Sequence, residues 1–210
     1  MSQFYSNDFD QMEKFYRAKF INSLSGVKSA NLVGTVDKNG QENLSIVSSA
    51  VHIGANPPLM AIVFRPATVP RHTFENIKET EVFTINHVGA TFFKKAHQTS
   101  ARYEKSESEF EAVGLSSEYV DGIKAPFVKE SSLKIGLKLR EIIHLEINKT
   151  ELVIGEINFV DVDDTYIKGD GHIDIEALNS VGVTGLDSYH ELKKPTRLSY
   201  AKPGQSLKEI

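Results

Sequence analysis

The chain contains no cysteine, and this absence excludes disulfide bonds, iron–sulfur clusters and catalysis by a thiol. It also has no run of about 18 consecutive apolar residues, the length that a membrane-spanning helix requires. The first twenty residues, MSQFYSNDFDQMEKFYRAKF, lack the apolar core of a secretory signal peptide. The sequence therefore predicts a cytoplasmic protein without a membrane segment.

Several sequence patterns that are typical of particular functions are absent as well. The net charge of −4 gives no electrostatic reason to expect nucleic-acid binding. The seven histidines fall in no H-x-x-x-H or H-E-x-x-H spacing, so no metal site is predicted. Neither a Walker or G-x-G-x-x-G glycine pattern nor a G-x-S-x-G nucleophile motif is present. A nicotinamide would therefore have to bind without a Rossmann unit.

The apolar pattern that is present favours a mainly β protein with peripheral helices. Alternating apolar residues over 133–147 and 151–162, joined by Asn148-Lys149, predict a long β-hairpin. Shorter strands are expected at 30–36, 42–51, 59–64 and 82–87, the 59–64 strand being apolar enough for burial on both faces. Helices are expected at 8–20, at 91–101, and up to about residue 80 from an N-cap at either Thr68 or Thr73. A long surface loop is expected at 100–125, with a short helical turn near 108–113.

The stretch from Asn43 to Asn86 carries the residues that suggest a ligand. A strand rich in small polar side chains comes first, and arginines and threonines then gather just before a predicted helix. Guanidinium groups and the free N–H groups of a helix start suit a bound phosphate. An ordinary loop with solvated arginines accounts for these residues equally well. The candidate residues are Asn43, Ser45, Ser48, Ser49, Arg65, Thr68, Arg71, His72 and Thr73.

The order of short motifs in this stretch provides a family resemblance. The chain reads N-L-x(3)-S-x(8)-P-P-L from Asn43, then R-H-T-x-x-N-I from Arg71, then F-x-I-N from Phe83, and it continues with Glu109-Phe110-Glu111 and Gly114-Leu115. In this order and spacing, from roughly Ser29 to Asp161, it resembles the flavin reductase-like family of FMN-binding split barrels, which includes flavoredoxin.

The resemblance implies an antiparallel split β-barrel that forms a homodimer, with FMN near the subunit interface. It also implies an oxidoreductase in which NAD(P)H or a redox protein reduces the flavin. On this basis we expect one domain over residues 1–210. It would consist of an N-terminal helical extension (1–26), a split-barrel core (27–165) and a C-terminal extension (166–210).

The resemblance also gives roles to the candidate residues. The FMN phosphate is expected on Arg65, Arg71 and Thr73, with Thr68 and His72 nearby. Asn43, Ser45, Ser48 and Ser49 are expected to meet the ring and the ribityl chain. Arg102 and Tyr103 of the long loop and Tyr189 of the tail are further candidates, although a solvated loop and a packed surface aromatic explain them as well.

No catalytic side chain is predicted, because the isoalloxazine carries the electrons and the protein supplies orientation and electrostatics. Two other functions therefore remain open at this point. One is a non-catalytic FMN-binding electron carrier, and the other is a split barrel that binds a different ligand.

Overall fold

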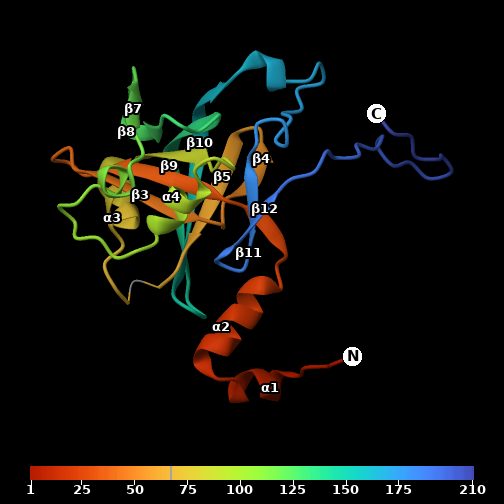
Figure 1. Cartoon of the computed structure of the whole chain (residues 1–210), viewed down its shortest axis with the longest axis horizontal. Helices are drawn as coiled ribbons and strands as arrows, with labels where there is room; N and C mark the ends of the chain where they lie inside the picture. The colour runs from red at the N-terminus through yellow and green to blue at the C-terminus, as the bar shows by residue number, and fades with distance from the viewer. Residues whose placement is uncertain (67) are drawn as a thin grey trace.

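In the part of the chain that the structure describes, a single antiparallel sheet of seven strands forms the body of the protein (Figure 1). The computed structural model describes residues 1–66 and 68–210. The strands lie in the order β3-β2-β6-β9-β10-β5-β4, and each hydrogen-bonded pair is antiparallel. Their bounds are β2 (Asn31–Val36), β3 (Glu42–Val47), β4 (Val51–Ala55), β5 (Pro58–Phe64), β6 (Val82–His87), β9 (Leu133–Leu145) and β10 (Thr150–Val162).

The connection between β3 and β4 forces this sheet to curl. These two strands stand at opposite edges of the sheet, yet only residues 48–50 join them. A linker of this length reaches about 14 Å when fully extended. The two edges must therefore come close together, although the strand order contains no β3–β4 pair that would close the barrel. The expected mainly β fold with an open antiparallel barrel is confirmed.

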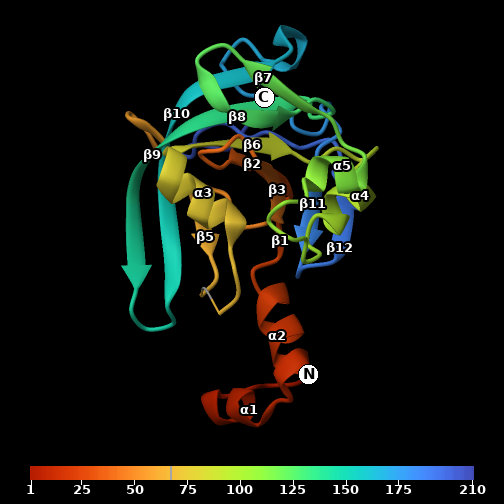
Figure 2. The same ribbon diagram turned by 90° about the vertical axis from the view of Figure 1, so that its left-hand side faces the viewer.

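Among the described residues, two small sheets and three of the five α-helices lie around the curled sheet, and the other two helices project from it (Figures 1 and 2). Among the described residues, none of the helices is long and apolar enough to cross a membrane. The small sheets are β1 (Val27–Ser29), β11 (Val181–Thr184) and β12 (Ser188–Glu191), in the order β1-β11-β12, and the hairpin β7 (Ser117–Val120) with β8 (Ile123–Val128). The helices are α1 (Ser6–Gln11), α2 (Lys14–Ser23), α3 (His72–Thr80), α4 (Phe93–Gln98) and α5 (Glu109–Val113), with a short 3₁₀ turn η1 (Asp164–Tyr166).

Both faces of β2 are buried, because the sheet carries a hydrophobic core on each side. Val33 packs with Phe74 and Ile77 of α3 inside the barrel. Leu32, which points the other way, packs with the core beneath α4 and α5, where Phe110 is fully enclosed. These two cores hold α3 and α5 on either side of β2 and β3, and this arrangement creates the site described below.

The N-terminal helices lie outside both cores. Figures 1 and 2 show α1 and α2 projecting from the body as an arm, and neither helix has a buried residue. Their aromatic rings pack mainly with one another, with Tyr16 and Phe20 stacked at a centroid separation of 6.3 Å. Phe15 and Tyr16 remain 72% and 57% exposed.

Several predicted boundaries are wrong, and local chemistry explains them. The expected helix over 8–20 is two helices, because the carboxylate of Glu13 starts a new one by accepting the N–H groups of Phe15 and Tyr16. The expected strand over 42–51 stops at Val47, where the chain crosses to the other edge of the sheet. The expected loop over 100–125 contains most of the β7–β8 hairpin, whereas the helical turn expected near 108–113 is confirmed as α5. The 59–64 strand leaves Val63 exposed, and the tail adds β11 and β12.

Candidate functional site

Strand β3 turns Asn43 and Ser45 toward the start of α3. Side chains alternate along a strand, so these two share a face, while Leu44 points into the core beneath α5. Their cross-strand partners on β2 are Thr35, opposite Asn43, and Val33, opposite Ser45. The predicted hydroxyl-rich strand therefore presents its polar atoms to the helix that follows the arginine-containing segment.

The first turn of α3 lies against this strand. Arg71 is the N-cap residue, and its side chain makes no capping hydrogen bond. The carboxylate of Glu75 accepts the Arg71 backbone N–H instead, at 3.3 Å. We expected Thr68 or Thr73 to cap this helix, and that prediction is wrong: Thr73 is buried inside the first turn. Nε of Arg71 is buried and has no hydrogen-bond partner among the described residues.

A chain of close polar contacts joins α3 to β3. Thr73 Oγ1 lies 2.7 Å from Asn43 Oδ1 and 2.8 Å from Ser45 Oγ. On the other side, Asn76 Nδ2 donates to Thr35 Oγ1 at 3.2 Å, and Thr35 Oγ1 donates to Asn43 Oδ1 at 3.3 Å. Asn43 and Thr73 are buried, so their polar atoms serve this internal network, whereas Ser45 is only half-buried.

Glu109 of α5 completes the network from the opposite side of β3. Both of its carboxylate oxygens accept from Asn43 Nδ2, each at 2.9 Å, and one also accepts the Leu44 backbone N–H at 2.9 Å. Burial raises the pKa of the Glu109 carboxyl, while the bond from Leu44, the amide of Asn43 and the nearby charge of His72 act in the opposite direction. A buried carboxylate with several N–H donors is thereby held within the core.

The other predicted residues line the two connections next to this network. Ser48 and Ser49 follow β3, and Arg65 and Thr68 are exposed in the segment between β5 and α3. Ser49 Oγ donates to the Val63 carbonyl at 3.0 Å and accepts the Val63 N–H at 3.3 Å. Its hydroxyl therefore ties the β3–β4 crossing to β5.

The further candidates lie on separate elements. Tyr103 accepts a hydrogen bond from Gln98 of α4 at 3.3 Å, and Arg102 is exposed. Tyr189 of β12 packs on Phe93, with ring centroids 5.0 Å apart, and its hydroxyl lies 3.0 Å from His97 Nδ1. Tyr189 is thus anchored to α4 by both its ring and its hydroxyl.

Three members of the network were not predicted as site residues: Thr35, Asn76 and Glu109. Asn76 and Glu109 belong to the motifs that carry the family resemblance, and Thr35 lies in a predicted strand. The sequence signal that could have identified them is a polar side chain among the apolar residues of a predicted strand or helix. Its partners come from segments up to 66 residues away in the sequence, so local pattern could not identify them.

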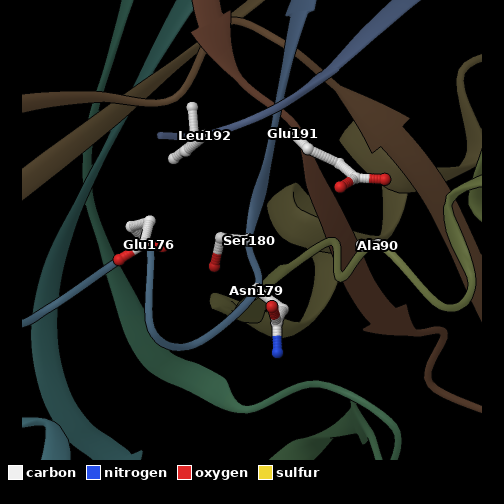
Figure 3. A pocket seen from close by; sticks show the side chains of 6 residues that line it. All are labelled: Ala90, Glu176, Asn179, Ser180, Glu191 and Leu192. Atoms are coloured by element: carbon white, nitrogen blue, oxygen red, sulfur yellow. The ribbon is translucent and has the colours of Figure 1, made fainter. Parts of the chain in front are cut away.

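A separate small cavity, shown in Figure 3, includes none of the predicted residues. Its volume is about 140 Å³. Pockets for ligands of drug size usually measure about 300–1,000 Å³, so this space does not suit a flavin. The residues around it are Ala90, Glu176, Asn179, Ser180, Glu191 and Leu192.

The sequence and the fold were both compared with those of known proteins. Residues 24–172 match the family model described as "Flavin reductase like domain". A crystal structure from Shewanella frigidimarina NCIMB 400, of a protein described as a flavin reductase with a split barrel domain, superposes with a TM-score of 0.92. It is 56% identical and covers 96% of this chain and 100% of that one.

Two further solved structures share the fold. Flavoredoxin of Desulfovibrio vulgaris (Miyazaki F) is 27% identical, with a TM-score of 0.70, and the match covers 86% of this chain and 93% of that one. Nitrilotriacetate monooxygenase component B from Bacillus cereus is 23% identical, with a TM-score of 0.83, and the match covers 94% of this chain and 98% of that one. At that lower identity the likeness concerns the fold alone.

Proposed function

Because the chain belongs to the flavin reductase like domain family, with the split-barrel fold expected from its sequence, we propose that it binds FMN and acts as an oxidoreductase. Electrons would pass through the flavin from NADH, NADPH or a redox-protein donor. The FMN site would lie where β3, the segment before α3 and the first turn of α3 meet.

The observation that carries this proposal is the buried, unpartnered Nε of Arg71 at the start of α3. A buried donor without an acceptor is costly, so such an atom indicates a missing partner. A phosphate oxygen at the N-terminus of a helix would satisfy it, and the first-turn N–H groups would add to the attraction. His72 would bring a further donor to the same end of the helix.

The remaining predicted residues would divide between the two ends of the ligand. Arg71, with Arg65, Thr68, His72 and the backbone of Thr73, would hold the phosphate. Ser45, Ser48 and Ser49 would lie along the ribityl chain and ring, while Asn43 acts from behind through its contact with Thr73. When bound, the isoalloxazine would supply the electron chemistry, and the protein would bind and orient it.

Titration of the purified, flavin-free protein with FMN tests the proposal directly. We expect saturable quenching of flavin fluorescence and a higher unfolding temperature with added FMN. A protein that neither changes the FMN spectrum nor gains stability would contradict the assignment and favour a split barrel for another ligand.

Mixing the FMN complex with NADH or NADPH under nitrogen separates the enzyme from an electron carrier. Rapid bleaching of the flavin absorbance by one nicotinamide is the result expected of a reductase. Bound flavin that neither nicotinamide bleaches, but that a reduced redox protein does, would indicate a carrier instead.

A homodimer is also part of the proposal. Apolar side chains are exposed on three strands of the curled sheet: Val51 and Ile53 on β4, Val63 on the adjacent β5, and Ile143 on β9, beyond β10. The arm formed by α1 and α2 exposes Phe15 and Tyr16 as well. A second copy of the chain would cover exposed apolar side chains of this kind. Light scattering coupled to size-exclusion chromatography should therefore give twice the chain mass.

A further inference from the structure

Glu109 lies at the end of a hydrogen-bond chain that leads to a half-buried hydroxyl of the proposed flavin site. Its carboxylate contacts Asn43 Nδ2, Asn43 Oδ1 contacts Thr73, and Thr73 contacts Ser45. The three donor–acceptor distances are 2.9, 2.7 and 2.8 Å. Each link is within ordinary hydrogen-bond range, so the direction of one bond constrains the next.

The carboxylate fixes the orientation of the Asn43 amide. Within residues 1–66 and 68–210, the groups that donate to the Glu109 oxygens are N–H groups, chiefly Asn43 Nδ2 and the Leu44 backbone. An ionised carboxylate accepts and cannot donate. Asn43 must therefore turn its Nδ2 toward Glu109, which leaves Oδ1, an acceptor, facing Thr73.

The single proton of each hydroxyl then sets the remaining directions. Thr73 has one O–H, and the amide oxygen of Asn43 can only accept it. Once Thr73 donates to Asn43, its oxygen can only accept from Ser45. Ser45 thus donates its hydroxyl proton to Thr73, and only the lone pairs of the Ser45 oxygen remain available to a ligand.

We propose that Glu109 is a positioning residue of the flavin site, which acts through Asn43 and Thr73 so that Ser45 offers the ligand an acceptor and no donor. This inference rests on the proposed binding of FMN at this site. An acceptor suits the O–H groups of the ribityl chain or the ring N–H. It does not suit the FMN phosphate, which is largely a dianion without a proton above about pH 7. Ser45 is therefore assigned to the flavin part of the ligand, and Arg71 to its phosphate.

Two variants test which atoms donate and which accept in these hydrogen bonds, while the side chains keep nearly the same shape. In Glu109→Gln, the new amide oxygen accepts from Leu44, and its NH₂ group then meets the NH₂ group of Asn43. Asn43 has to turn over, Thr73 must donate to Ser45, and the Ser45 proton points at the ligand. In the double variant Asn43→Asp with Glu109→Gln, the carboxylate and the amide exchange places, so Thr73 again faces an acceptor.

FMN affinity is measured for both variants at pH 8, together with the unfolding temperature without FMN. One hydrogen bond contributes a net factor of about 2 to 12 in affinity, so we expect Glu109→Gln to bind FMN about fivefold more weakly. The double variant should recover to within about twofold of the unchanged protein. Glu111→Gln, an exposed carboxylate on the same helix, is the matched control and should leave FMN affinity unchanged.

Unchanged FMN affinity in Glu109→Gln would overturn the inference, and so would a double variant no tighter than Glu109→Gln itself. The second outcome would reduce Glu109 to a packing role. Failure of the unchanged protein to bind FMN would instead refute the proposed function, so the two failures are distinct.

Ser45→Ala supplies a second test that does not depend on how the buried pair folds. FMN and riboflavin, which lacks the phosphate, are titrated into the same protein. If Ser45 meets the flavin part, both ligands should lose affinity by the same factor, about two- to tenfold. A loss confined to FMN would place Ser45 on the phosphate, and no loss for either ligand would remove it from the site. Either result contradicts the assignment.

Discussion

The imidazole of His87, at the end of β6, faces the hydroxyl of Ser180 with Nδ1 and Oγ 3.2 Å apart. Ser180 is buried, and it also lines the small cavity shown in Figure 3. Burial lowers the pKa of His87 from 6.5 to about 4, because the charged form would lose its hydration. The imidazole of His87 is therefore neutral in the folded state above about pH 4.

The lowered pKa of His87 predicts a loss of stability in acid. Between pH 6.5 and about 4 the unfolded chain binds a proton that the folded chain does not, so the free energy of unfolding falls as the pH falls through this window. The full shift corresponds to about 3 kcal/mol. Denaturant unfolding at a series of pH values measures this dependence. His87→Gln, which cannot titrate, should show a shallower slope over the same window, and an unchanged slope would assign the acid sensitivity to other groups.

Arg71→Ala should weaken FMN binding by about one to two orders of magnitude, because charge-assisted hydrogen bonds contribute about 1.5–3 kcal/mol each. Riboflavin has no phosphate, so its affinity should change little. Fluorescence titration with both ligands measures the two effects. Lys78→Ala is the matched control, since Lys78 is a cation in the last turn of the same helix. An equal loss for both ligands in Arg71→Ala would place the phosphate elsewhere.

The strands with a clear alternating pattern were the most predictable part of the fold. The hairpin of β9 and β10 lies within one to two residues of its predicted bounds, and β2, β5, β6 and α3 also begin and end close to where the pattern indicates. Each of these elements buries a set of apolar residues that is visible in the sequence, either as an alternating face or as a continuous run. The crossing at residues 48–50 was not predicted, because its geometry depends on the curl of the whole sheet. The local sequence pattern contains no information about that curl.

The candidate site was predictable in its residue types but not in the roles of its buried members. Asn43, Ser45 and Thr73 do come together from segments about 30 residues apart. Their contacts with one another, and the contact of Asn43 with Glu109, depend on how α3 and α5 pack on β3. The sequence identifies such residues as polar members of a motif. Only the packing shows which of them are buried in the hydrogen-bond network and which lie on a surface that a ligand can reach.

Thr73→Val should destabilise the protein even without a ligand. Valine has nearly the shape of threonine but no hydroxyl, so Asn43 Oδ1 would lose its closest partner and Ser45 would lose its acceptor. Leaving buried polar groups unpaired costs about 1–3 kcal/mol. Urea unfolding of the flavin-free protein gives this difference. Thr73→Ser keeps the hydroxyl and should lose less stability than Thr73→Val, and equal losses in both would show that the methyl group rather than the hydrogen bonds matters here.

Ile53→Glu tests the proposed dimer. Ile53 lies on the edge strand β4 and is 45% exposed, so a glutamate there can be solvated in a single chain and should leave folding intact. In a dimer that buries this strand, two carboxylates would be desolvated without partners, and association should weaken by at least tenfold. Light scattering over a dilution series measures the mass, and circular dichroism checks the fold. Ile53→Val keeps the apolar surface and should remain a dimer. If Ile53→Glu associates as tightly as the unchanged chain, the interface lies on another face of the sheet or on the arm formed by α1 and α2.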